Sequence, residues 1–327
     1  MRSRENRKFD DGQWYRFGRN QNLDKQEEAK LIVAETVPSL RLCHDDGGAF
    51  FLNNVRVNGI LPNQSAGGWF LLGILNAPPC DFVFRRTAKP KEGGYFEANK
   101  QFIAPLPIPD ATPEERNRVG ELAKELQSLH TRRRDLVKSL DDRLQSGQTT
   151  PTNWEPEDIW QDVGSVKDWK DNPEAPAELK GRALTAWAKK SREEALTQHL
   201  ESLDALLMPD AAIGVENTDA EIRLFIGGNE VLRLFDKPDT PFIAAQWRHA
   251  LRDVRVTQAF DGKRLLRLLL NLRTTADTGL RDRIVALDAE IATLDGEIVD
   301  RESEINTLIY GLYKLEPDEI AMIEADR

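Results

Sequence analysis

The C-terminal part of the chain carries an apolar residue at every third or fourth position, and this repeat constrains the fold more than any other feature. It consists of Leu280, Ile284, Leu287, Ile291, Leu294, Ile298, Ile305, Leu308 and Leu312, with Arg301 as the polar interruption. This spacing predicts one long helix with a single apolar stripe, which must be buried against a partner. Isoleucine at heptad position a with leucine at d suits a two-stranded coiled coil.

A second helix with a matching stripe is expected earlier in the chain. Thr112 suits the N-cap, Pro113 the first helical position, and Glu115 completes a capping box. Its apolar positions are Val119, Leu122, Leu126, Leu129, Leu136 and Leu140, interrupted by Arg133. We therefore expect an antiparallel pair within the chain, between a spacer helix over 111–145 and a C-terminal coiled-coil helix and tail over 276–327. A coiled-coil dimer, in which the stripe packs on a second chain, is the alternative.

The segment 1–110 is expected to form a mixed α/β domain. Its apolar runs predict strands at 31–34 and 49–52, a helix or buried strand at 69–76, and a turn into an aromatic strand at 93–96. The proline-rich segment 105–109 cannot donate ladder hydrogen bonds and should close the domain.

The middle of the chain divides into two expected parts. Residues 146–178 are polar and rich in proline and tryptophan, which predicts an insertion with little regular structure. Residues 179–275 are expected to form a helical subdomain, in which Gly227-Gly228-Asn229 between two alternating runs predicts a β-hairpin. The whole chain is thus expected to be α+β, with a mainly helical region after the N-terminal domain.

Bulk composition excludes several classes of protein. The 327 residues are 40% hydrophobic and 31% charged, with no apolar run of membrane-spanning length and no signal-peptide stretch. Two cysteines, Cys43 and Cys80, cannot form a disulfide framework. We expect a cytoplasmic protein without a membrane partner.

The net charge of -10 argues against a polyanionic partner, but it is unevenly distributed. Residues 1–110 carry 15 Lys and Arg against 13 Asp and Glu, a net +2, so the remainder carries -12. The front third can therefore still present a basic face.

One short segment, 14–21, combines two aromatic residues, two arginines and two amides. Arginine binds phosphates and the guanine edge, whereas asparagine and glutamine match the adenine edge. The candidate DNA contacts in this segment are Arg16, Arg19, Asn20 and Gln21, while Trp14 and Tyr15 are interpreted as packing residues.

Further candidates for DNA contact follow within the same domain. Asn53, Asn54 and Arg56 are candidates for base or phosphate contacts, and Arg85, Arg86, Lys89 and Lys91 for phosphate contacts. For every one of these residues, a solvated surface position is the alternative.

The order of these segments resembles a known family. The segment 14–21 is followed by Lys30-Leu-Ile-Val33, Asp45-Asp-Gly-Gly48, Trp69-Phe-Leu-Leu-Gly-Ile-Leu-Asn76, Gly93-Gly-Tyr-Phe96 and Leu106-Pro-Ile-Pro109 before the long helix. This order is similar to the C-terminal target-recognition (specificity) domain of adenine-specific DNA methyltransferases, including fused type IIG restriction–modification enzymes. The tail, from Ile309 to Ile320, is similar to the ending of such proteins, and the resemblance covers about 10–140 and 280–325.

The resemblance implies duplex DNA as one partner and a methyltransferase domain or subunit as the other. In that family the methylating domain binds S-adenosylmethionine and holds a flipped adenine with an Asn/Asp-Pro-Pro-Tyr/Phe motif. The chain matches neither element: in Asn76-Ala77-Pro78-Pro79-Cys80 an alanine separates the asparagine from the prolines, and a cysteine cannot stack. We therefore expect no catalytic residues, metal or cofactor in this chain, and place S-adenosylmethionine in a missing methylating domain.

Two functions of other classes remain open. The acidic helical part can be a protein–protein scaffold whose front domain no longer binds DNA. A nuclease within 206–275 would use Asp210 and Glu221, although Arg223 stands where such sites have lysine. A zinc site at Cys43-His44 lacks a second cluster to complete it.

Overall fold

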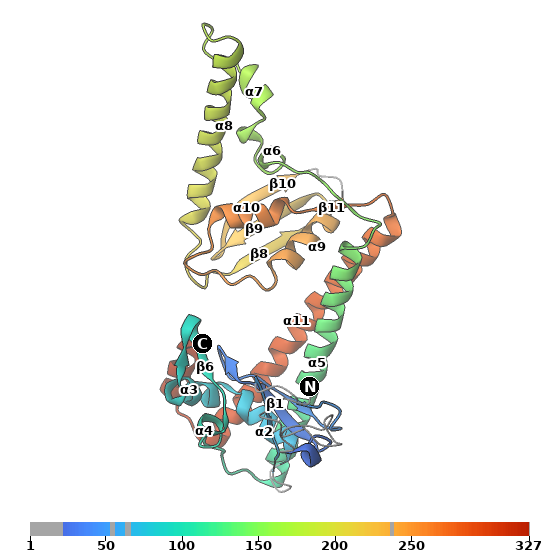
Figure 1. The fold of residues 1–327 in the computed structure, drawn as a ribbon, viewed down its shortest axis with the longest axis vertical. Coiled ribbons are helices and arrows are strands. Elements are labelled where there is room, and N and C mark those ends of the chain that lie inside the picture. Colours follow the sequence, from blue (N-terminus) through green and yellow to red (C-terminus); the bar gives the residue numbers. More distant parts are fainter. Residues whose placement is uncertain (1–21, 53–55, 63–66, 236–238, 327) are drawn as a thin grey trace, which may run out of the picture. The chain divides into compact units, whose positions relative to one another are not determined.

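The computed structural model describes residues 22–52, 56–62, 67–235 and 239–326 and has a mixed α+β fold (Figure 1). The chain forms two compact units. The first unit combines 1–131 with 296–327, and the second consists of 132–295. None of the helices in the described part of the chain has the length and apolar character needed to cross a bilayer.

The first unit contains two small antiparallel sheets. One has the order β3-β1-β4 and the other β2-β6-β5. Their strands are β1 (Lys30–Ala34), β2 (Thr36–Val37), β3 (Leu42–Asp45), β4 (Val57–Ile60), β5 (Pro90–Lys91) and β6 (Tyr95–Glu97). The helical elements of this unit are η1 (Leu23–Lys25), α2 (Gly68–Asn76), α3 (Pro78–Thr87), η2 (Glu92–Gly94), α4 (Lys100–Ile103) and α12 (Pro317–Ala325).

The core of the first unit joins its β1 strand to α2, α3 and the adjacent parts of two long helices. Leu31, Ile74 and Phe84 are fully buried there. Ile309, from the last turns of the C-terminal long helix, is buried in the same core. Of the two alternatives for 69–76, the structure has the helix, α2, and its apolar residues pack in the core.

The outer edge of β3 is closed by amide side chains from helices. Gln127 accepts a hydrogen bond from His44 N at 2.6 Å and donates one to His44 O at 2.9 Å. Asn76 does the same with Leu42, at 2.7 Å and 3.0 Å. Each amide reproduces the pair of bonds that a neighbouring strand would supply, so an edge that would otherwise lack partners is satisfied.

A carboxylate extends this edge toward the start of β3. The side chain of Asp81, on α3, accepts a hydrogen bond from Leu40 N at 2.5 Å. Three helices therefore each provide one polar side chain to the backbone at alternate positions, and this fixes the register of the helices against the sheet.

The expected strand at 49–52 is wrong. Asp45 follows His44 in β3, and its carboxylate accepts hydrogen bonds from Ala49 N and Phe50 N, both at 2.9 Å. These bonds turn the chain into a loop, because the amides that a strand would offer to a neighbour are occupied by a side chain. Phe50 and Phe51 are 63% and 61% exposed as a result.

The same carboxylate forms a buried ion pair. Lys30 Nζ lies 2.8 Å from Asp45 Oδ2, and both side chains are less than 5% exposed. Lys30 Nζ also donates to the carbonyls of Gln26 and Glu28 at 2.7 Å and 3.2 Å. All three N–H groups of Lys30 thus have an acceptor, and both carboxylate oxygens of Asp45 accept hydrogen bonds. A buried ion pair is tolerated when its groups are hydrogen-bonded in this way.

The two long helices are α5 (Pro113–Leu144) and α11 (Thr278–Tyr313), and they run antiparallel in each unit (Figure 1). In the first unit Arg301 Nε lies 2.8 Å from Glu125 Oε1, and in the second Arg133 pairs with Asp295. The two arginines that interrupt the apolar stripes therefore find carboxylates on the opposite helix. Most of the stripe on α11 is buried, with Ile291 fully buried in the second unit, whereas Leu308 is 38% exposed.

The second unit is built around the sheet β10-β9-β8, one face of which packs on α9 and α10 (Figure 1). The expected hairpin is confirmed as β9 and β10, and β8 adds a strand that was not expected. The strands of the second unit are β7 (Thr150–Pro151), β8 (Ile213–Asn217), β9 (Glu221–Ile226), β10 (Asn229–Phe235) and β11 (Arg273–Thr274). β7 and β11 pair with each other in a separate sheet. The helical elements of this unit, besides the adjoining parts of α5 and α11, are α6 (Pro156–Ile159), η3 (Gln161–Val163), α7 (Val166–Lys170), α8 (Gly181–Asp204), α9 (Thr240–Leu251) and α10 (Gly262–Leu270).

The segment 146–178 has more regular structure than its composition indicates. It contains β7, α6, η3 and α7. Trp160 is buried in the core of the second unit, and Trp169 donates from its indole nitrogen to Val163 O at 2.6 Å. The tryptophans supply the apolar contacts that hold these short elements in place. The polar composition of the segment gave no indication of these contacts.

We predict that Gln127→Ala lowers the free energy of unfolding of the first unit by about 1–3 kcal/mol, because it leaves the buried backbone groups of His44 without partners. Hydrogen exchange at residues 40–44 and urea denaturation measure this effect. Gln101→Ala, at an exposed glutamine of the same unit, is the matched control. Equal stability and exchange in the two variants would show that the edge is not held by Gln127.

A second prediction concerns acid stability. Burial raises the pKa of Asp45, but the bonds from Lys30, Phe50 and Ala49 outweigh it, and the net pKa is below the usual 3.8. Because the folded-state pKa is lowered, the stabilisation is present above about pH 4 and is lost as the pH falls through the folded-state value. Asp45→Asn should cost about 3–5 kcal/mol at pH 7, since it leaves the Lys30 ammonium buried without a counter-charge.

The measurement is the free energy of unfolding between pH 3 and pH 7. The difference between wild type and Asp45→Asn should shrink toward pH 3. Asp46→Asn, at the exposed neighbouring carboxylate, should leave the pH profile close to that of the wild type. A constant difference across the whole range would contradict the role given to Asp45.

Candidate nucleic-acid interface

Six of the candidate DNA contacts lie outside the described residues. They are Arg16, Arg19, Asn20, Gln21, Asn53 and Asn54, and the packing candidates Trp14 and Tyr15 lie outside them too. The structure therefore bears on the remaining candidates only.

Arg56 and Lys89 are exposed and lie beside strand backbones. The carbonyl of Arg56 accepts a hydrogen bond from Glu35 N at 2.7 Å, and that of Lys89 accepts one from Glu97 N at 3.0 Å. The backbones of Arg56 and Lys89 are thus held by the two sheets of the first unit. The Cα position of each residue on the surface is therefore fixed.

Lys91 is paired within the chain. Its Nζ lies 3.1 Å from Glu97 Oε2, and this bond holds the pKa of the Glu97 carboxyl below its usual value. Both groups are at the surface, where such a pair contributes little to stability and exchanges readily for another anion.

Arg85 and Arg86 lie in the last turn of α3 and share one carboxylate. Arg85 pairs with Asp326 and also lies 3.3 Å from Asp81, while Arg86 lies 3.0 Å from Asp326. The hydrogen bond from Arg86 is the largest cause of the lowered pKa of Asp326. The guanidinium of Arg86 also lies 3.3 Å from the ring centre of Phe82. Both candidates for phosphate contact are therefore largely neutralised inside the molecule.

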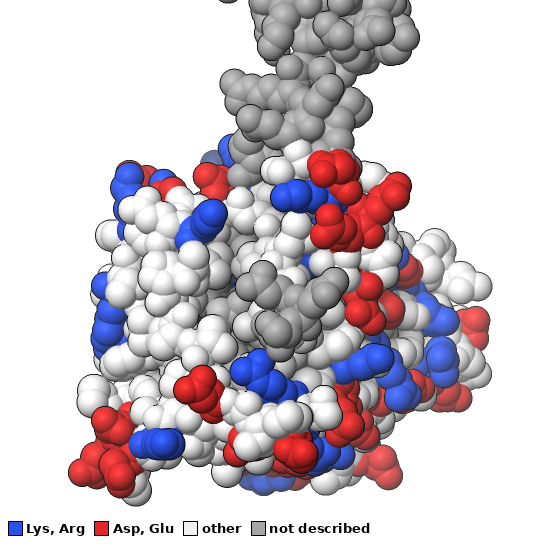
Figure 2. Space-filling model, turned by 90° about the horizontal axis from the view of Figure 1, so that it is seen from below, with Lys and Arg blue, Asp and Glu red and all other residues white. Residues whose placement is uncertain are grey.

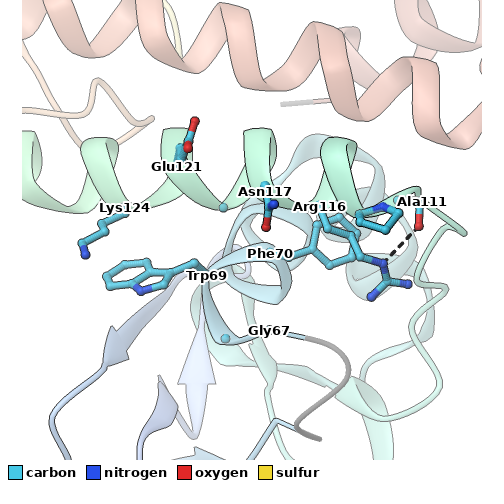
Figure 3. A pocket seen from close by; sticks show the side chains of 11 residues that line it. Gly67, Trp69, Phe70, Ala111, Arg116, Asn117, Glu121 and Lys124 are labelled. Atoms are coloured by element: carbon cyan, nitrogen blue, oxygen red, sulfur yellow. Dashed lines mark hydrogen bonds between the residues drawn. The ribbon is translucent and has the colours of Figure 1, made fainter.

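The first unit contains a pocket that combines aromatic and cationic side chains (Figure 3). We call it the cationic–aromatic pocket. It has a volume of about 620 Å³ and lies between the start of α2 and the first turns of α5. Its lining residues are Gly67, Gly68, Trp69, Phe70, Ala111, Pro113, Arg116, Asn117, Gly120, Glu121 and Lys124.

Two cation–aromatic pairs define the ends of this pocket. At one end Lys124 Nζ lies 5.6 Å from the ring centre of Trp69, and at the other the Arg116 guanidinium lies 4.9 Å from that of Phe70 (Figure 3). Arg116 Nε also donates to Ala111 O at 3.1 Å, which fixes the guanidinium over the ring. Such pairs keep a positive charge next to an apolar surface.

Glycines allow the close packing on which the pocket depends. A Cβ at Gly68 would lie 2.4 Å from His44 Nε2, and one at Gly120 would lie 3.4 Å from Trp69 Cβ. The ring of His44 meets Trp69 edge-on at 4.5 Å between centres. The indole is therefore held between β3 and α5, with its orientation set by neighbours on both sides.

The charge of the pocket is positive on balance. Arg116 and Lys124 contribute two cations against the single carboxylate of Glu121, which lies 3.9 Å from Arg118. No described residue forms an ion pair with Lys124. An aromatic face beside the Lys124 cation suits a planar ring attached to a phosphate, as in a nucleotide.

The residues of this pocket were not among the candidate contacts predicted from the sequence. Arg116, Gly120 and Lys124 lie four residues apart and so share one face of α5, but they were interpreted only as parts of a spacer helix. The four-residue spacing was the one sequence signal that these residues share a helix face. It indicates a binding site only once the structure shows that Trp69 lies opposite that face.

The motif nearest to a catalytic one has a structural use. Both polar atoms of the Asn76 amide bond the backbone of Leu42, so they are not available to a substrate. Cys80 is buried, its Sγ lies 3.3 Å from Tyr313 Oη, and burial raises its pKa to about 11. This segment therefore closes the fold of the first unit.

The positions of the candidate carboxylates do not support the nuclease and metal-site alternatives. Asp210 lies 3.0 Å from Arg255 Nε, and both side chains are exposed. Glu221 lies 3.5 Å from Arg223, a pairing between neighbours on one strand. In the described ranges no group of three metal-ligating side chains comes together.

The face of the molecule seen in Figure 2 mixes both signs of charge. Basic and acidic side chains lie intermixed around a broad uncharged area, and neither sign forms a continuous field on that face. No family model matches this chain, and no match to a curated protein was found.

Proposed function

We propose that the first unit recognises a DNA sequence for an adenine-specific methyltransferase of the restriction–modification type. In this proposal the unit binds duplex DNA and positions it for a methylating domain that lies outside this chain. S-adenosylmethionine would be bound by that domain. The order of segments from 14–21 to Leu106-Pro-Ile-Pro109 motivates the assignment.

The cationic–aromatic pocket is the observation that supports this proposal best. Lys124 offers a charge to a phosphate, and Trp69 offers a ring to a base or a sugar. Phosphate contacts of this kind set the register of a protein on DNA, while base contacts provide the specificity. The candidates at 16–21 and 53–54 would supply the latter.

The long helices have a separate role in the proposal. We assign them as an antiparallel coiled-coil spacer, on which the methylating partner docks. The pairing of Arg301 with Glu125 and of Arg133 with Asp295 supports a fixed register between them. A fixed register is what a spacer needs to hold a distance.

The expected result is duplex binding that weakens as salt rises, because each phosphate contact releases bound cations. Lys124→Ala should weaken binding to all sequences alike and reduce the slope of log affinity against log salt by about one. Fluorescence anisotropy with labelled duplexes of varied sequence at several salt concentrations measures both. Lys263→Ala, an exposed lysine of the second unit, is the matched control.

A helical scaffold without DNA binding is the second candidate. The internal pairing of Arg85 and Arg86 favours it, since these cations are already neutralised by carboxylates of the same chain. Absence of binding to any duplex at low salt, with a folded protein, would reject the DNA proposal in favour of the scaffold. Equal salt slopes for Lys124→Ala and wild type would reject the role of the pocket.

A further inference from the structure

The sheet of the second unit ends in a strand with only one neighbour. Its order is β10-β9-β8, so β10 pairs with β9 on one side. Among the described residues, no backbone hydrogen bond joins 230–234 to any segment other than β9. Unlike β3, whose outer edge is closed by helix side chains, β10 keeps a row of backbone donors and acceptors that have no partners among the described residues. Such a row is a template for a further strand.

A groove runs along this free edge. It has a volume of about 360 Å³ and is lined on one side by residues 231–235 of β10. The other side consists of residues 158–162, from α6 and η3, together with His199 of α8. Five strand residues span about 17 Å, which is the length of the segment that can pair with β10 here. A groove of this size holds a single extended segment more readily than a second folded sheet.

The wall opposite β10 is held in place by stacking. The ring of His199 lies parallel to that of Trp160, 4.7 Å between centres with 7° between planes. Trp160 is only 7% exposed and belongs to the core of the unit, so it anchors the histidine. His199 Nε2 lies 2.8 Å from Asp162 Oδ2, which in turn fixes the position of that carboxylate at the groove.

The charge in the groove favours a basic occupant. The Asp162 side chain is 69% exposed. The groove also contains Arg233, but its guanidinium lies 2.7 Å from Glu230 and 3.7 Å from Glu221 and is already compensated. Asp158, the other carboxylate of the groove, is half-buried and accepts a hydrogen bond from Glu155 N. The exposed negative charge is therefore that of Asp162, which would repel a nucleic acid and attract lysine or arginine.

We propose that this groove binds an extended peptide segment of a partner protein, which adds to β10 as a further strand and places a lysine or arginine against Asp162. Backbone hydrogen bonds along β10 provide affinity, and the side chains at alternate positions provide specificity. Phe235, 58% exposed at the end of the strand, offers an apolar surface to one of those side chains. The site is in the second unit and does not depend on DNA binding by the first.

The test uses the full chain and three labelled octapeptides. The first alternates lysine and valine, the second has glutamate in place of lysine, and the third is the lysine peptide with every second backbone amide N-methylated. Fluorescence anisotropy should show binding of the first peptide and binding at least about tenfold weaker for the glutamate peptide. The N-methylated peptide keeps the charge but cannot complete the strand pairing, so it should not bind. Hydrogen exchange should slow at 231–235 when the first peptide is added.

A charge reversal tests the position of the basic side chain. Asp162→Lys should weaken binding of the lysine peptide at least about tenfold, whereas Asp282→Lys changes the net charge equally at an exposed carboxylate on α11 and should leave binding unchanged. Circular dichroism checks that both variants fold. The arm with the N-methylated peptide needs no variant and tests strand pairing by itself.

Several outcomes would overturn the proposal. These are equal binding of the lysine peptide and its N-methylated form, equal effects of the two charge reversals, or absence of binding by all three peptides. A dimer in light scattering with 231–235 already protected would make a second copy of this chain the occupant, and would also overturn it. None of these results bears on duplex binding by the first unit, so the two proposals fail separately.

Discussion

The fold of the first unit depends on how the open edge of a short sheet is satisfied. A strand of four residues at the edge of a sheet would normally lose its outer hydrogen bonds to water or to another chain. Here Asn76, Asp81 and Gln127 occupy those positions from three different helices. Because each bond fixes one helix to one backbone position, the sheet, α2, α3 and α5 form one connected framework. The cationic–aromatic pocket exists because this framework sets α5 opposite Trp69.

The periodic elements of this fold could be predicted from the sequence, because their residues carry local information. The stripe from Leu280 to Leu312 and the capping box at Thr112 predicted two long helices, found as α11 and α5. The Gly227-Gly228 turn predicted the hairpin of β9 and β10. In each case the residues that determine the element lie close together in the chain. The sequence pattern therefore predicted the element that the structure has.

The elements that sequence reasoning missed depend on contacts between distant residues. The run 49–52 is apolar enough for a strand, yet the carboxylate of Asp45 takes its amides and turns it into a loop. The pocket required Trp69 to meet Arg116 and Lys124 across more than forty residues. Likewise, Arg85 and Arg86 looked available for phosphate until Asp326 was placed beside them. Charge content alone says which groups are present, and only the fold says which of them remain accessible.

The first unit is discontinuous, and this has a consequence for how the chain matures during synthesis. Its core needs Ile305 and Ile309, which leave the ribosome after the whole insert 132–295 has been made. The insert has its own core, centred on Trp247 and the β8–β10 sheet. It can therefore fold before the last part of α11, which completes the core of the first unit, has been synthesised. Until α11 arrives, the apolar faces of α2 and α5 stay uncovered in the nascent chain. Exposed apolar surface of this kind makes a partly made chain prone to aggregation until residues 296–313 have been synthesised.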